Sequence, residues 1–257
     1  GYPELTVLDS TVPSAVNAVT EAIDAARALF LVSSKSGSTV ETGSLYAHFR
    51  DLVEEVTAPD KAGKSFVAIT DPETSLEGLA RDAGFRRIFL NPPDLGGRYS
   101  VLSYFGLVPA ALMGADVEVL LDRADNMREG CAASVQAHEN PGAWLGAAMS
   151  TLATRGRDKL TLVTSPSIRS LGLWVEQLIA ESTGKDGKGI VPVAGEPLMA
   201  PGHYGDDRCF VYLRVMGDDN TVMDEAVQRL EFAGQPVVRL DLRDAYDLGA
   251  EFYRWEF

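Results

Sequence analysis

Short runs of apolar residues alternate along the chain with segments in which apolar residues recur at helical spacing. In the first half, such runs lie at residues 6–8, 29–32, 66–69 and 88–90. Runs of this length, bounded by turn residues, are typical of strands buried inside a parallel sheet. Helices are expected between them at residues 15–26, 42–55 and 76–82. This order of strands and helices predicts an α/β fold.

The second half repeats the alternation after a helical stretch. Helices are expected there at residues 102–113, 116–136 and 143–154. Strands are then predicted at residues 160–164, 190–193, 210–215 and 237–240, with helices at 172–182 and 222–232. Asn140-Pro141-Gly142 interrupts the helical stretch, and we place the domain junction there. We therefore expect two related α/β subdomains, residues 1–140 with the connecting helices and residues 141–257.

Composition and charge narrow the class of protein. Of the 257 residues, 46% are hydrophobic and 23% are charged, as in ordinary globular proteins. The formal net charge of -14 argues against a nucleic-acid partner, because phosphate backbones are held by clustered Lys and Arg. The uncharged stretch at residues 99–115 is short for a bilayer and contains Pro109, so it predicts a buried helix and no membrane partner. Cys131 and Cys209 show neither disulfide nor zinc-binding spacing, which fits a reducing cytoplasm.

A hydroxyl-rich segment follows the second predicted strand. Residues 34–42 read Ser-Lys-Ser-Gly-Ser-Thr-Val-Glu-Thr, and a helix is expected to begin within them. Hydroxyls and backbone N–H groups would converge at this helix N-terminus, where the helix dipole favours a phosphate. Gly37 would let the backbone approach the anion, and Lys35 would add a positive charge. Taken alone, the segment could equally be a Ser/Thr-rich turn with an N-cap.

Two further segments place polar residues where they suit catalysis. Gly96-Gly97-Arg98 lies in a loop after a predicted strand, although an arginine beside Asp94 is more often part of a surface ion pair. Gln177 and Glu181 are four residues apart and share one face of a predicted helix that ends at Gly184. On its own, Glu181 would be read as a solvated carboxylate at a helix end.

These three segments, in this order, resemble the signatures of the phosphoglucose isomerase family. The family's phosphate loop is commonly written Ser-Lys-(Thr/Ser)-x-(Thr/Ser)-Thr-x-Glu-Thr, its arginine loop Gly-Gly-Arg-(Tyr/Phe)-Ser, and its catalytic helix Gln-x-x-x-Glu-Ser-x-Gly-Lys. The resemblance implies that Arg98 stabilises an enediolate, that Glu181 moves a proton between C1 and C2 of the sugar, and that Gln177 donates a hydrogen bond to the substrate. It implies that the sugar phosphate is bound by Ser34, Lys35, Ser36, Ser38, Thr39 and Thr42. A partly desolvated pocket would help a carboxylate to act as base and conjugate acid.

A histidine is the fourth catalytic candidate. His203 follows Gly195-Glu196-Pro197 at the spacing at which the family has a histidine that helps to open the sugar ring. The intervening Leu-Met-Ala-Pro departs from the family's usual Gly-Thr-Asn-Gly-Gln, so a surface role for His203 stays open. Family dimers supply this histidine across the subunit interface, so the resemblance allows a homodimer. His48 and His138 show no metal-ligand spacing and are expected to be structural.

The resemblance covers most of the chain and implies its fold. We expect two sugar-isomerase (SIS) subdomains, each a three-layer αβα sandwich with a mainly parallel sheet. The first is expected to lack its first strand and Gly-rich loop, and the second its C-terminal catalytic segment with a lysine. Residues 91–114 look closest to the isomerase half of bifunctional transaldolase/phosphoglucose isomerases. The chain is therefore expected to be part of a longer enzyme and to be weakly active or inactive alone.

The implied activity is the interconversion of glucose 6-phosphate and fructose 6-phosphate through a cis-enediol, with no metal or nucleotide cofactor. Two alternatives stay open. One is a non-catalytic sugar-phosphate-binding SIS module, which would need the hydroxyl-rich segment but neither Arg98 nor Glu181. The other is an isomerase of mannose 6-phosphate or an amino sugar phosphate, because specificity depends on the shape of the pocket.

Overall fold

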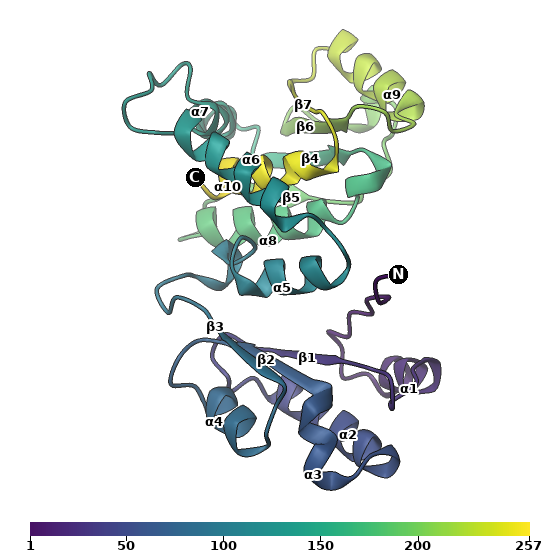
Figure 1. The fold of residues 1–257 in the computed structure, drawn as a ribbon. Helices are drawn as coiled ribbons and strands as arrows, with labels where there is room; N and C mark the ends of the chain where they lie inside the picture. The colour runs from purple at the N-terminus through teal and green to yellow at the C-terminus, as the bar shows by residue number, and fades with distance from the viewer. The chain divides into compact units, whose positions relative to one another are not determined.

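The chain folds into two compact units, Gly1–Val117 and Glu118–Phe257, in a computed structural model that describes residues 1–257 (Figure 1). Each unit has its own sheet and its own hydrophobic core. Every strand pair in the two sheets is parallel. The predicted α/β fold with mainly parallel sheets is therefore confirmed. The subdomain boundary at residue 140 stays a prediction.

The first unit is built on a three-stranded sheet in the order β1-β2-β3. Its strands are β1 (Phe30–Ser33), β2 (Phe66–Thr70) and β3 (Arg87–Leu90). Its helices are α1 (Pro13–Ala22), α2 (Val40–Val56), α3 (Pro59–Ala62), α4 (Ser75–Asp82) and α5 (Tyr104–Leu112). Short 3-10 turns lie at Gly63–Ser65 and Gly97–Tyr99. Helices α2, α3 and α4 lie on one side of the sheet and α5 on the other (Figure 1).

Aromatic side chains fill the core of the first unit. The ring of Phe66 is fully buried, and its centroid lies 5.1 Å from that of Phe30 and 5.5 Å from that of Phe85. All five residues of β2 are buried, as expected for a central strand covered on both faces. Each buried side chain of this size stabilises the fold by about 1.5–3 kcal/mol. The firmly held strand β2 thus fixes the carboxyl edge of the sheet.

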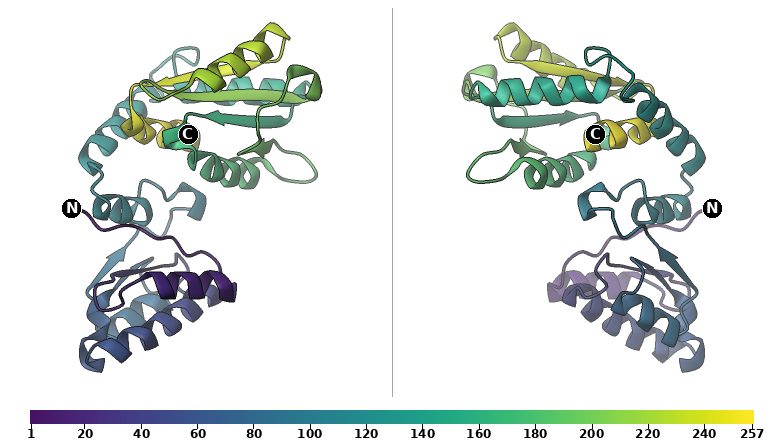
Figure 2. Two further views of the ribbon diagram at one scale, coloured as in Figure 1. Left: turned by 90° about the vertical axis from the view of Figure 1, so that its right-hand side faces the viewer. Right: turned by 90° about the vertical axis from the view of Figure 1, so that its left-hand side faces the viewer.

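The second unit is built on a four-stranded sheet in the order β5-β4-β6-β7. Its strands are β4 (Lys159–Thr164), β5 (Val191–Val193), β6 (Arg208–Val215) and β7 (Val237–Leu242). Its helices are α6 (Val117–Gly130, which begins at the unit boundary), α7 (Pro141–Thr154), α8 (Leu171–Thr183), α9 (Thr221–Phe232) and α10 (Leu248–Glu256). Short 3-10 turns lie at Pro166–Ile168, Pro201–His203 and Ala245–Asp247. Helices α8 and α9 cover opposite faces of this sheet (Figure 2).

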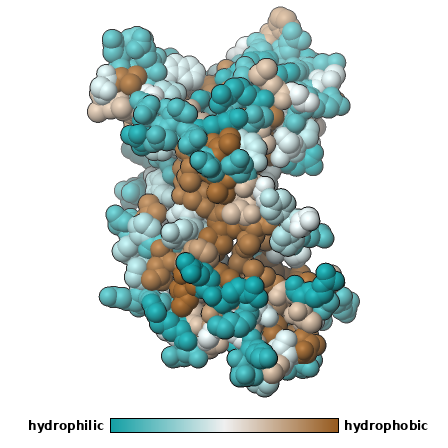
Figure 3. Space-filling model, viewed as in Figure 1, coloured by the Kyte–Doolittle hydropathy of each residue, from teal (hydrophilic) through white to brown (hydrophobic).

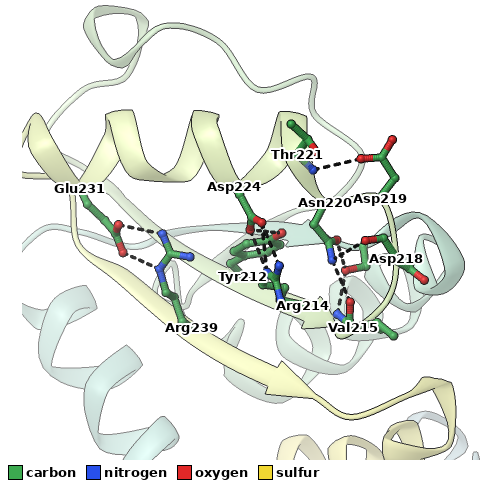
Figure 4. A network of polar contacts seen from close by, with 11 residues as sticks. Tyr212, Arg214, Val215, Asp218, Asp219, Asn220, Thr221, Asp224, Glu231 and Arg239 are labelled. Carbon is green, nitrogen blue, oxygen red and sulfur yellow. Dashed lines mark hydrogen bonds and ion pairs between the residues drawn. The ribbon is translucent and has the colours of Figure 1, made fainter.

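Polar contacts fasten α9 to the sheet beneath it (Figure 4). Asp224 accepts a hydrogen bond of 2.9 Å from the buried hydroxyl of Tyr212 and pairs with Arg214 at 2.9 and 3.0 Å. Two turns further along α9, Glu231 pairs with Arg239 through two bonds of 2.8 Å. The hydrogen bond from Arg214 lowers the pKa of Asp224, so this carboxylate stays charged. Both pairs fix the position of α9 on β6 and β7.

Two cysteines of the second unit are free thiols and are buried. Cys209 lies on β6 with a relative exposure of 2%, and burial raises its pKa to about 11. The Cys209 thiol is therefore protonated at neutral pH. Figure 3 shows apolar residues among hydrophilic ones on the face that it draws. The large apolar side chains exposed on the protein include those of Trp144, Tyr104 and Met113.

Two predictions about the elements are wrong. Residues 6–8 form no strand, because Leu8 packs against the core of the first unit without pairing to another strand. Residues 99–115 do contain a helix, α5, but none of its residues is buried. Because α5 is apolar around its whole circumference, only part of it can face the sheet. The other predicted strands and helices are confirmed, although α1 ends at Ala22, short of the predicted residue 26, and α6 ends at Gly130, short of the predicted residue 136.

Candidate functional site

The hydroxyl-rich segment forms the connection between β1 and α2, and we call residues 34–39 the serine loop. Ser34 is buried, its Oγ lies 2.9 Å from Oγ1 of Thr39, and it accepts a hydrogen bond of 3.2 Å from the N–H of Gly37. Ser36 and Ser38 are exposed, and their hydroxyls lie 3.2 Å apart. The loop is thus closed internally by Ser34 and presents the hydroxyls of Ser36 and Ser38 at the surface.

The serine loop leads directly into the N-terminus of α2. Thr39 is the N-cap residue, and no side chain caps the N–H groups of the first turn. Thr42 lies in that turn and is partly exposed. Uncapped amides at the positive end of a 17-residue helix favour a bound anion. The geometry expected for a phosphate site is therefore present, with hydroxyls and amides at one helix end.

Gly37 shapes the serine loop through its backbone. Its φ of +67° lies in the left-handed region, which residues with a Cβ rarely adopt. A Cβ at this position would also lie 2.6 Å from Cβ of Thr74. In addition, the hydroxyl of Ser75 donates a 2.6 Å hydrogen bond to the carbonyl of Gly37. The turn that follows β2 therefore packs closely against the serine loop and requires glycine there.

Lys35 extends from the serine loop along the sheet edge. Its ammonium group pairs with the carboxylate of Asp71, which directly follows β2. It also donates a 3.2 Å hydrogen bond to the carbonyl of Pro93. The charge that the sequence offers for a phosphate is thus engaged by a carboxylate in this structure.

Arg98 lies in the segment after β3, and we call residues 91–100 the arginine loop. Its guanidinium carbon is 4.9 Å from the ring centroid of Tyr99, a distance typical of a cation–π contact. At the base of the loop, Asn91 is 2% exposed, and its Oδ1 accepts a 2.9 Å hydrogen bond from the N–H of Tyr104. The hydroxyl of Ser100 donates to the carbonyl of Gly97 at 2.6 Å. These bonds hold the chain on both sides of Arg98.

The predicted catalytic helix is α8. Nε2 of Gln177 donates a 3.0 Å hydrogen bond to Oε1 of Glu181, so the two side chains share a face as expected. Both are exposed, and the structure does not enclose Glu181 in the partly desolvated pocket expected from its role. Gly184 is the C-cap, and its N–H donates to the carbonyl of Ala180 at 2.9 Å. A Cβ on Gly184 would lie 2.6 Å from that carbonyl oxygen, so this position requires glycine for space.

His203 ends a 3-10 turn in a loop at residues 194–204, between β5 and β6. The imidazole is exposed, and its Nδ1 lies 3.2 Å from the carbonyl oxygen of Ala200. The start of the loop is held by Glu196, which forms a 2.8 Å ion pair with Arg208. Arg208 also donates to the buried hydroxyl of Thr161 at 2.7 Å. The loop that carries His203 is therefore anchored to β4 and β6.

Asp71, Asn91 and Arg208 were missed by sequence reasoning. Asp71 and Asn91 each directly follow a buried or half-buried strand, where ligands bind in open parallel sheets, so this signal was available. Arg208 opens a strand and resembles an ordinary surface arginine in the sequence. Only the fold shows that it holds the loop of His203.

The site candidates fall into two groups by unit. The serine loop and the arginine loop belong to the first unit, and the hydrogen bond from Lys35 to Pro93 joins them. Gln177, Glu181 and His203 belong to the second unit. No cluster of three His, Cys, Asp or Glu side chains is arranged to bind a metal ion. No helix is both long and apolar enough to span a lipid bilayer.

Sequence comparison identifies named relatives of the chain. A family model described as phosphoglucose isomerase matches residues 3–191. The glucose-6-phosphate isomerase of Rubrobacter xylanophilus is 36% identical over 195 residues, which are 75% of this chain and 44% of that protein. The enzyme of the same name from Staphylococcus saprophyticus is 33% identical over 203 residues, 77% of this chain and 45% of that protein. The chain thus spans less than half the length of these curated relatives.

Solved structures share the fold. A hypothetical protein of Thermus thermophilus superimposes with a TM-score of 0.81 at 23% identity, over 97% of this chain and 69% of that one. A glucose-6-phosphate isomerase of Chlamydia trachomatis superimposes with a TM-score of 0.74 at 16% identity, over 95% of this chain and 56% of that one. The structures support the fold, and the family model covers well over half of the sequence. The chain therefore belongs to the phosphoglucose isomerase family.

Proposed function

We propose that the chain supplies the sugar-phosphate-binding and proton-transfer residues of an enzyme that interconverts glucose 6-phosphate and fructose 6-phosphate. The observation that carries this proposal is the serine loop, in which exposed hydroxyls stand at the uncapped N-terminus of α2. Family membership favours this reading over a hydroxyl-rich turn without a ligand. The relatives named glucose-6-phosphate isomerase support the substrate.

In the proposed complex, the phosphate binds at the start of α2. Ser36, Ser38, Thr39 and Thr42 donate hydrogen bonds to its oxygens, together with amides of the first turn. Ser34 shapes the loop from inside, since its hydroxyl is already bonded to Thr39 and to the N–H of Gly37. The ammonium group of Lys35 is paired with Asp71, so Lys35 contributes to the site by holding the serine loop in place.

The proposed chemistry is a proton transfer between neighbouring carbons. Glu181 removes the proton from C2 of the open-chain aldose, and the electron pair moves through the C1–C2 bond to give a cis-enediolate. Returning that proton to C1, while the hydroxyl proton of O2 passes to O1, gives the ketose, so no oxidant, reductant or cofactor is consumed. Arg98 stabilises the developing oxyanion, because a guanidinium stays charged and offers several donors. Gln177 orients the substrate and Glu181, and His203 assists ring opening.

Several features of the whole protein belong to the same proposal. The two sheets would correspond to two SIS subdomains, with the subdomain boundary at residue 140 and the family's remaining site residues in a longer polypeptide. We propose a homodimer and a cytoplasmic location, the latter supported by two free cysteines. A link to a transaldolase domain stays a prediction, because the relatives carry the isomerase name alone.

An activity assay with two proteins tests the proposal. Glucose 6-phosphate turnover is measured for the 257-residue chain and for the longer protein that contains it. We expect turnover by the longer protein and little or none by the chain. Binding of 6-phosphogluconate without turnover by either protein would instead favour a non-catalytic module. Turnover of mannose 6-phosphate or an amino sugar phosphate in place of glucose 6-phosphate would overturn the assignment of glucose 6-phosphate as the substrate.

A further inference from the structure

Three polar residues stand side by side at the carboxyl edge of the first unit's sheet. The register of β1, β2 and β3, continued past their ends, places Asp71 between Lys35 and Asn91. Backbone hydrogen bonds continue the sheet to this point, from the N–H of Asp71 to Lys35 at 3.4 Å and from the N–H of Asn91 to Thr70 at 2.9 Å. We call Lys35, Asp71 and Asn91 the edge row.

Two atoms of the edge row are buried and have no hydrogen-bond partner in the protein. Oδ2 of Asp71 pairs with Lys35, whereas Oδ1 is buried without a partner. Oδ1 of Asn91 must be the atom that faces the N–H of Tyr104, because only the oxygen can accept, and this leaves Nδ2 buried without a partner. Buried polar atoms in native proteins are nearly always satisfied. Here one acceptor and one donor remain without a partner just beyond the ends of neighbouring strands.

The chemistry of the two atoms selects the ligand. A cation is disfavoured by the N–H donor of Asn91, and an anion by the charge of Asp71. Both atoms are shielded from solvent, so a substrate group cannot reach them. Neighbouring strands lie about 4.8 Å apart, and two hydrogen bonds of about 2.9 Å that meet at one oxygen can span such a gap. We propose that Asp71 and Asn91 bind one internal water molecule, which accepts from Nδ2 and donates to Oδ1.

The water completes a link between the two loops of the candidate site. Lys35 belongs to the serine loop, and Asn91 closes the base of the arginine loop through Tyr104. The series of polar contacts from Lys35 through Asp71 and the water to Asn91 therefore holds the phosphate-binding hydroxyls at a fixed distance from Arg98. This role rests on the proposed function, and it makes Lys35, Asp71 and Asn91 positioning residues. The charge of Lys35 neutralises Asp71 instead of contacting the phosphate.

A crystal structure of the 257-residue chain tests the water directly. We expect one ordered water within hydrogen-bond distance of Oδ1 of Asp71 and Nδ2 of Asn91. The Asn91→Leu variant removes the donor and should lose this water. The proposal is overturned if the wild-type site holds no water, or if Nδ2 contacts Asp71 directly. The wild-type structure decides the question even if the variant does not fold.

A rescue experiment tests the positioning role. Affinity for 6-phosphogluconate is measured by calorimetry for the wild type, Lys35→Met, Asp71→Asn and the double variant. Lys35→Met leaves a buried carboxylate unpaired and should weaken binding by about tenfold or more, because a buried charge without its partner destabilises its surroundings. In the double variant no charge remains, so affinity should return to within about threefold of the wild type.

A double variant that does not regain affinity would contradict the positioning role. If the Lys35 ammonium contacts the phosphate, the double variant binds as weakly as Lys35→Met, and the positioning role is overturned. If the wild type binds no sugar phosphate at all, in the chain or in the longer protein, the proposed function fails instead. The crystal structure still decides whether the edge row holds a water.

Discussion

Hydroxyl groups of the serine loop divide into two kinds that the sequence does not distinguish. Ser34 is buried and bonded within the loop, whereas Ser36 and Ser38 are exposed. A buried hydroxyl needs its partners to offset desolvation and so fixes the local backbone. An exposed hydroxyl can exchange water for a ligand at small cost. Binding and shape are therefore assigned to different residues of the same loop.

Replacing the candidate base gives a direct test at the residue scale. In the longer protein, Glu181→Gln should keep the hydrogen bond with Gln177 and the fold but lower isomerase turnover by about 100-fold or more, because the amide cannot accept the carbon-bound proton. Glu176→Gln is the matched control, since Glu176 is also exposed on α8. Steady-state kinetics of both variants check this prediction. Normal turnover by Glu181→Gln would remove Glu181 from the mechanism.

Two glycines near the serine loop should respond in opposite directions to the same substitution. Gly37→Ala meets a positive φ and the Thr74 side chain, so it should destabilise the chain by about 1–2 kcal/mol. Gly43→Ala lies inside α2 with no atom near the new Cβ, and it should stabilise by about 0.5–1 kcal/mol. Denaturant unfolding measures both. Equal effects at the two positions would contradict the backbone described for the loop.

At the scale of elements, α10 carries a buried glutamate whose charged form is disfavoured by the surrounding packing. Glu251 is 3% exposed, Oε1 pairs with Arg254 at 3.3 Å, and Oε2 has no partner. Burial raises the pKa of Glu251 to about 6, and the nearby Arg254 only partly opposes this effect. The folded second unit therefore holds a proton on α10 at pH values at which the unfolded chain has released it.

The sign of the resulting pH dependence follows from linkage. Between about pH 4.5 and 6 the folded chain binds more protons at Glu251 than the unfolded chain, so its contribution to stability falls as pH rises. Glu251→Gln should then raise the thermal midpoint more at pH 7.5 than at pH 4.5, by the equivalent of about 1–2 kcal/mol. Thermal melts at both pH values, with exposed Glu176→Gln as control, measure the difference. An equal shift of the thermal midpoint at both pH values would contradict the raised pKa of Glu251.

The periodicity of apolar residues predicts most helices and strands correctly. It fails for segments whose structure depends on tertiary packing. The continuous apolar runs at residues 66–69 and 210–215 predict strands because such runs need cover on both faces, which the two units supply. A three-residue run such as 6–8 carries no information on whether a partner strand exists. The apolar composition of α5 likewise predicts a helix but not how much of it is covered.

In the candidate site, too, some features follow from the local sequence and others depend on the fold. Hydroxyls at the start of α2 and the pairing of Gln177 with Glu181 follow from local spacing, and both are present. The pairing of Lys35 with Asp71 joins residues that follow two neighbouring strands, so it depends on sheet order and register. Local motifs therefore indicate which residues carry chemistry, while the fold determines which of them are already engaged.

At the scale of the whole molecule, the division into two units predicts independent folding. Each unit has a parallel sheet with helices on both faces and a core of its own. Residues 1–117 and 118–257, expressed separately, should each unfold in a cooperative thermal transition. Circular dichroism of the two fragments checks this. A fragment without a transition would show that its core needs the rest of the chain.

The rate at which the buried thiol of Cys209 is labelled can measure how often the second unit opens. Alkylating reagents attack thiolates, and burial keeps this sulfur both covered and protonated on β6. Labelling of Cys209 therefore requires that the sheet first open, and its rate measures how often that happens. Cys131, buried just beyond the end of α6, samples the helical part of the same unit. The two labelling rates would show whether the sheet and the helices open together, and no engineered cysteine is needed.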